Sequence, residues 1–117
     1  MIMNEKRLSI LEDAVSKFGT VNQLDMAIEE CAELIQAINK IKRTFPPETI
    51  SQFYREYNSP QMPRFQSESD ALIYHGLCGE IADVEILLEQ MRLIFNTETI
   101  DLIKERKLMR LQERLYK

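Results

Sequence analysis

Residues 25–43, DMAIEECAELIQAINKIKR, have the pattern of one amphipathic helix, and an acidic residue breaks its apolar face. Glu30 falls inside this face and Glu33 at its edge, while Glu29 points further towards solvent. A carboxylate that faces a core is costly unless a cation or a hydrogen-bond donor meets it. Some group elsewhere in the chain must therefore meet Glu30. The apolar face comprises Leu24, Ala27, Ile28, Cys31, Leu34, Ile35, Ile38 and Ile41.

Helical periodicity recurs on both sides of this stretch. Gly19 fits just past the end of a predicted helix over residues 4–18. Gly76 and Gly79 weaken the third helix and allow a break or a close helix approach there. Long helices with short connections predict an all-α helical bundle of four main helices, in a single domain over residues 1–117. The predicted helices span about 4–18, 21–43, 69–95 and 98–116.

The segment at about 44–69 is an insert that differs in composition from the helices around it. It holds all four prolines and most of the aromatic residues, and Pro46 and Pro47 end the helix before it. Its aromatic residues either stack on a ligand or form a lid, or they cover the core or a subunit contact. A short amphipathic helix within the insert is predicted from Ile50, Phe53, Tyr54 and Tyr57.

Composition excludes several classes of protein. A chain of 117 residues with 44% apolar and 29% charged residues is typical of one soluble globular domain. The net charge of −4 argues against a nucleic-acid partner, because such proteins usually carry a basic footprint. No apolar run approaches membrane-spanning length, and MIMNEKRLSI is charged too early for a signal peptide. Cys31 and Cys78 are expected as buried free thiols, which favours a cytoplasmic protein.

The stretch GEIADVEILL, residues 79–88, repeats the acidic pattern of the predicted helix over residues 21–43. Glu80 falls inside the apolar face and Asp83 at its edge, while Glu85 points elsewhere. If the two helices pack face to face, four carboxylates converge, and they cannot all stay ionised without a cation. Such oxygen ligands suit Mg²⁺, with Mn²⁺ as a substitute. The alternative is two solvated acidic faces that arise by chance in a chain with 19 acidic residues.

The last predicted helix carries a lysine on its apolar side. Ile100, Ile103 and Leu111 define an inner stripe, and Lys107 falls within it. An inward lysine complements an acid cluster or a phosphate held there. The alternative is that its stem packs while the ammonium group reaches water. Three further cations flank the stripe: Lys104, Arg110 and Arg114.

The sequence lacks the residue patterns of several other metal and catalytic sites. A di-iron centre in a helical bundle typically needs two Glu-x-x-His motifs, and the only histidine, His75, lies off the apolar face. The chain has no zinc-type Cys/His spacing, no glycine-rich phosphate loop and no Ser-His-Asp set.

EECAE (29–33) followed by EIAD (80–83) resembles the Glu-Glu-x-x-Glu … Glu-x-x-Asp signature of the MazG-like all-α NTP pyrophosphohydrolases. The flanking DMAIEECAELIQAINKIKR, EIADVEILLEQM and KERKLMRLQERL are similar to small single-domain members from bacteria and phages. The resemblance covers about two-thirds of the chain. One departure is the spacer of 46 residues between Glu33 and Glu80, which is longer than in compact members and concerns the substrate pocket more than the metal site.

The resemblance implies Mg²⁺-dependent hydrolysis of a nucleoside or deoxynucleoside triphosphate to the monophosphate and pyrophosphate. One motif glutamate, Glu33 or Glu29, takes the proton of the attacking water. Lys107 and Arg110 resemble the family's C-terminal basic residues, which meet phosphates. The metal ligands that the resemblance implies are Glu30, Glu33, Glu80 and Asp83.

A second apolar face predicts self-association. Ile86 and Leu93 lie on the back of the third helix, away from Glu80, which favours a homodimer or a homotetramer. Oligomerisation would then complete the helical bundle. Two other functions remain open: a non-catalytic helical module that binds a partner or regulates, and an all-α relative of the dUTPase type.

Overall fold

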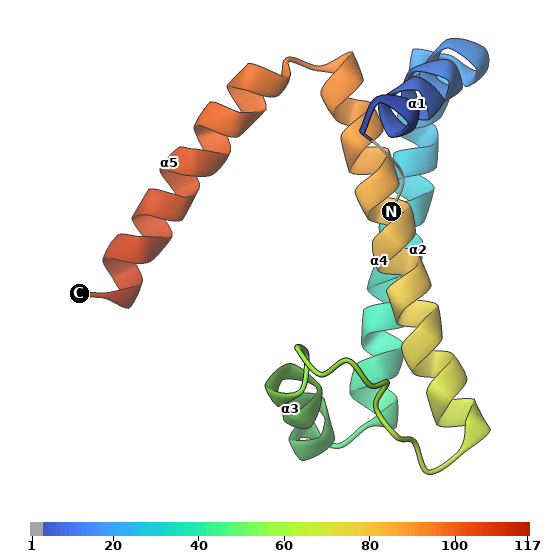
Figure 1. Cartoon of the computed structure of the whole chain (residues 1–117), viewed down its shortest axis with the longest axis vertical. Helices are drawn as coiled ribbons and strands as arrows, with labels where there is room; N and C mark the ends of the chain where they lie inside the picture. Colours follow the sequence, from blue (N-terminus) through green and yellow to red (C-terminus); the bar gives the residue numbers. More distant parts are fainter. Residues whose placement is uncertain (1–3) are drawn as a thin grey trace. The chain divides into compact units, whose positions relative to one another are not determined.

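The computed structural model describes residues 4–117, which form five helices and no strand (Figure 1). The all-α prediction is therefore confirmed. Within these residues, no helix combines the length and the hydrophobicity needed to cross a bilayer. The helices are α1 (Asn4–Phe18), α2 (Thr20–Thr44), α3 (Pro47–Arg55), α4 (Glu68–Ile94) and α5 (Thr97–Leu115).

The helix ends lie where the sequence places them. Gly19 separates α1 from α2 with a φ of 89°, a left-handed conformation that glycine adopts without steric cost. Pro46 and Pro47 separate α2 from α3, and Pro47 occupies the first turn of α3, where its missing N–H is not needed. Ser67 Oγ accepts a hydrogen bond from the backbone N–H of Asp70 at 3.1 Å and so caps α4.

The chain divides into two compact units, and the divisions fall inside α2 and α4. Residues 25–85 form the central unit, which contains most of α2, all of α3 and the first two-thirds of α4. The terminal unit comprises α1, the start of α2, the end of α4 and α5. That 1–117 forms one domain stays a prediction.

An aromatic cluster forms the core of the insert in the central unit. Neighbouring rings among Phe45, Phe53, Phe65 and Tyr74 have centroids between 5.0 and 6.2 Å apart. Phe53 on α3 therefore packs against the core. Tyr54 and Tyr57 instead stack on each other, and both are exposed.

In the terminal unit, α1 packs on the end of α4. Leu11 and Leu87 are buried, and Arg7 forms an ion pair with Glu89, to which its Nε also donates a hydrogen bond. Arg92 bonds Asp101 at 2.6 Å and so ties the end of α4 to the start of α5.

Three sequence expectations need correction. Ile103 and Leu111 do not form a buried stripe, because α5 has no buried residue and its apolar side is uncovered in the described residues. Cys31 and Cys78 are free, as predicted, but both are exposed, because the apolar faces that hold them are only partly covered. The helix α4 runs without a break through Gly76 and Gly79, and a Cβ added at either glycine would meet no atom within 4 Å.

Candidate metal centre

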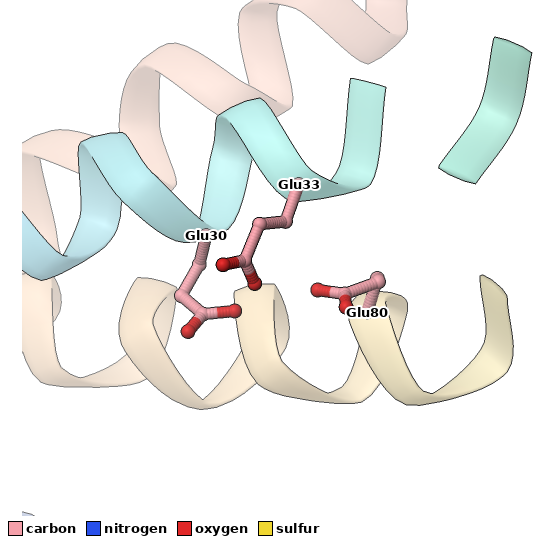
Figure 2. Close-up of side chains that lie close together, drawn as sticks. All are labelled: Glu30, Glu33 and Glu80. Atoms are coloured by element: carbon pink, nitrogen blue, oxygen red, sulfur yellow. The ribbon is translucent and has the colours of Figure 1, made fainter. Parts of the chain in front are cut away.

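Three glutamates from two antiparallel helices of the central unit point towards one another (Figure 2). Glu30 and Glu33 lie one turn apart on α2, and Glu80 projects from α4. Ala27 and Ile41 are buried on the same side of α2. The packing of these two helices therefore turns the acidic side chains inward, as the apolar pattern predicts.

One carboxylate oxygen from each glutamate lies within 4.8 Å of the others. Glu30 and Glu80 are partly buried, whereas Glu33 is exposed at the rim. This order agrees with the predicted positions of Glu30 and Glu80 inside the apolar faces and of Glu33 at an edge. Within the described residues, these three glutamates are the group placed to share one ion.

The electrostatics of the cluster oppose ionisation of its two inner members. Burial, and then the negative charges of Glu33, Asp83 and Glu80, raise the pKa of Glu30 above its ordinary value. Burial, followed by the charges of Glu33 and Asp83, likewise raises the pKa of Glu80. Like charges at this separation cannot all be accommodated unless protons or a cation compensate them.

Two buried oxygen atoms of the cluster have no hydrogen-bond partner in the described part of the chain. Oε2 of Glu30 and Oε2 of Glu80 are buried without a hydrogen bond among the described residues. Leaving such atoms unsatisfied is costly. A hard divalent cation accepts several carboxylate oxygens, so this donor set fits Mg²⁺ or Mn²⁺.

Asp83 and Glu29 lie outside the group of three. Asp83 is exposed one turn along α4 from Glu80, and its charge acts on the pKa of both inner glutamates, so it borders the cluster. Glu29 is exposed on α2 and belongs neither to the group nor to the charges that shift Glu30. Their proposed roles as a ligand and as an assisting residue stay predictions.

The predicted phosphate contacts belong to the terminal unit. Lys107 and Arg110 are exposed on α5, where they line a shallow depression with Glu113 and Arg114. Lys107 also borders the apolar side of α5, next to Ile103 and Leu111, as the periodicity predicts. Its side chain is exposed there, which agrees with the alternative in which the ammonium group reaches water.

Sequence reasoning missed two cations that share a groove with the acid cluster. Lys40 and Arg43 line this groove together with Glu33 and Glu80. Their spacing of seven and ten residues from Glu33 is the signal that would have found them, because it places all three on one helical face.

Comparison of the chain with protein-family models, with curated proteins and with solved structures finds no match.

Proposed function

We propose that the chain is a Mg²⁺-dependent nucleoside triphosphate pyrophosphohydrolase that releases a nucleoside monophosphate and pyrophosphate. The observation that carries this proposal is the cluster of Glu30, Glu33 and Glu80. Two of these glutamates have a buried oxygen without a hydrogen-bond partner in the part of the chain that the structure describes. Such a donor set is suited to a cation that binds phosphates. The motif resemblance supplies the substrate class, and the proposed enzyme is cytoplasmic.

The chain's residues have distinct roles in the proposed reaction. The ion would be held by Glu30, Glu33 and Glu80, together with Asp83. When bound, it would neutralise negative charge on phosphate oxygens. Water attacks a phosphorus atom, the bridging P–O bond between the α- and β-phosphates breaks, and the leaving group departs with the electron pair of that bond. Glu33 takes the proton of the water, since its carboxylate lies at the exposed rim, and Glu29 is the alternative base. The motif resemblance assigns the phosphate contacts of the terminal unit to Lys107 and Arg110.

The test is a panel of ribo- and deoxyribonucleoside triphosphates with Mg²⁺, in which monophosphate and pyrophosphate are separated. Glu30→Gln and Asp83→Asn are expected to lower kcat/KM by about 100-fold or more, because even residues behind metal ligands contribute 10- to 100-fold. Glu85→Gln, an exposed acid on the same helix, should retain activity. No turnover by the wild type, or full turnover by both variants, would contradict the proposal.

The same panel addresses the other functions. Turnover restricted to deoxyuridine triphosphate would identify an all-α dUTPase-type relative. A non-catalytic helical module would hydrolyse none of the substrates, and its thermal stability would not respond to Mg²⁺ or Mn²⁺.

The proposed enzyme is a homodimer or a homotetramer. Exposed apolar residues support this assembly, because large uncovered apolar surfaces are uncommon on monomers. In the central unit α2 exposes Ile28, Ile35 and Ile38, and in the terminal unit Ile86 and Leu93 are exposed, as predicted from the second apolar face.

A further inference from the structure

An open groove extends from the acid cluster within the central unit, between the C-terminal half of α2 and the N-terminal half of α4. Glu33 and Glu80 line one end, and Lys40 and Arg43 lie further along the α2 wall. The volume of this open groove is about 1080 Å³, slightly above the roughly 300–1,000 Å³ of clefts that bind small molecules. The groove therefore has room for a ligand that extends well beyond the three glutamates.

The α2 wall changes the sign of its charge along its length. Glu33, Gln36, Lys40 and Arg43 recur every three or four residues, so their side chains lie on one helical face. At the rise of an α-helix, Lys40 begins about 10 Å and Arg43 about 15 Å from Glu33 along the axis. The flexible four-carbon stem of Lys40 allows its ammonium group to reach back towards the acidic end.

Side chains of residues 4–117 do not neutralise these two cations. In the part of the chain that the structure describes, neither Lys40 nor Arg43 takes part in an ion pair. The remaining carboxylate of the groove, Glu68, is not paired with either of them. Two positive charges in a groove are therefore available to an anionic ligand.

The α4 wall leaves the path between the two ends open. It presents the apolar side chains of Leu72, Ile73 and Leu77, and Gly76 lies among them without a side chain. A Cβ added at Gly76 would meet no atom within 4 Å, so no neighbouring residue fills this space. A ligand held at Glu33 and Glu80 can thus continue along the groove to Lys40.

We infer that Lys40, with Arg43 beyond it, binds the terminal phosphates of a polyphosphate whose first phosphates lie at the acid cluster. This inference rests on the proposed function and adds phosphate contacts within the central unit to those of Lys107 and Arg110. A cation at the glutamates neutralises only the phosphates beside it, and the remaining phosphates need donors further along the groove. Lysine serves as a point charge for phosphate, and arginine offers a fork of N–H donors.

The test measures binding of inorganic tripolyphosphate to the full chain by calorimetry in the presence of Mg²⁺. Lys40→Gln is expected to raise the Kd about 10-fold or more, because a charge-assisted contact is lost. The matched control is Lys42→Gln, which removes the same charge from an exposed position on α2 outside the groove and should leave the Kd within about twofold. Equal Kd values for the two variants would overturn the inference.

Kinetics separate a phosphate contact from a base contact. If Lys40 meets phosphates, Lys40→Gln raises KM by a similar factor for every nucleotide base. If it instead changes the ranking of the bases and leaves tripolyphosphate binding intact, Lys40 contacts the base and the inference is wrong.

Failure of the proposed function has a different signature. A wild-type protein that hydrolyses no triphosphate contradicts the enzyme, whereas the calorimetric comparison of Lys40→Gln with Lys42→Gln still decides the role of Lys40. Conversely, if the wild type hydrolyses triphosphates and both lysine variants have its Kd for tripolyphosphate, the proposed function stands and the inference about Lys40 is wrong.

Discussion

Glu30 shows at the scale of one residue how an apolar helical face can accept a carboxylate. Its burial and the charges of Glu33, Asp83 and Glu80 raise its pKa, and its Oε2 has no hydrogen-bond partner among residues 4–117. Both facts mean that the free protein is destabilised by the ionised side chain, and that a cation would remove the penalty. The position is therefore unfavourable for stability alone and favourable for binding a cation.

This penalty predicts a pH dependence for the metal-free protein. Because the folded-state pKa of Glu30 is raised above 4.5, the folded state holds a proton that the unfolded chain releases. The free energy of unfolding therefore falls as pH rises from 4.5 through the raised pKa. Glu30→Gln removes this loss, so in the presence of a chelator its Tm should exceed that of the wild type at neutral pH and match it in acid.

Mg²⁺ should reverse that order. In the proposed site the ion would bind the ionised carboxylates, so Mg²⁺ should raise the Tm of the wild type, and the effect should increase with pH. Glu30→Gln should lose most of this response, while Glu85→Gln should keep it. Thermal unfolding followed by circular dichroism across pH provides the measurement, and an equal Mg²⁺ response in all three proteins would count against a metal at Glu30.

At the scale of an element, α4 carries two glycines that its fold does not require. The helix is continuous, and neither Gly76 nor Gly79 allows a close approach of another segment. Glycine inside a helix costs about 0.5–1 kcal/mol relative to alanine. Gly76 lines the groove of the central unit, where it presents no side chain.

Substitution by alanine should change the free energy of unfolding in opposite directions at a glycine inside a helix and at a glycine with a positive φ. Gly79→Ala is expected to raise the free energy of unfolding by about 0.5–1 kcal/mol, since the added Cβ meets open space. Gly19→Ala makes the same change at a φ of 89°, where it should lower that free energy by about 1–2 kcal/mol. Urea denaturation measures both, and a destabilised Gly79→Ala would show that α4 is packed differently around that residue.

At the scale of the whole molecule, sequence periodicity predicts the helices better than their environments. The predicted helix ends fall within a residue or two of α1, α2, α4 and α5, because glycine, proline and capping residues act locally. The convergence of Glu30, Glu33 and Glu80 also followed from periodicity, since the apolar faces determine which sides of two helices meet.

Burial is where sequence reasoning failed, and the reason is physical. An apolar stripe indicates which side of a helix is to be covered, but it does not say by what. Hence Ile103 and Leu111 were expected inside and are exposed, as are both cysteines. Lys40 was missed because an exposed lysine on a helix is ordinarily a solvated surface residue. Only the structure shows that a groove lies beside it.

The uncovered apolar residues lead to a prediction about assembly. Ile86 and Leu93 in the terminal unit are 47% and 40% exposed, although their hydrocarbon side chains gain from burial. We expect sedimentation at micromolar concentration to show a species of at least twice the 13.8 kDa of one chain. Ile86→Lys with Leu93→Lys should shift this species towards the monomer, because two buried charges would oppose association.

A third substitution separates association from general effects of added charge. Tyr116→Lys places the same residue type at a position that is 81% exposed near the end of α5, and it should leave the mass unchanged. Helical content by circular dichroism should be alike in all variants, since none of the replaced side chains is buried. A wild type that sediments as a monomer would refute self-association, and a double variant with wild-type mass would place the contact on another apolar face, such as Ile28 and Ile35 of α2.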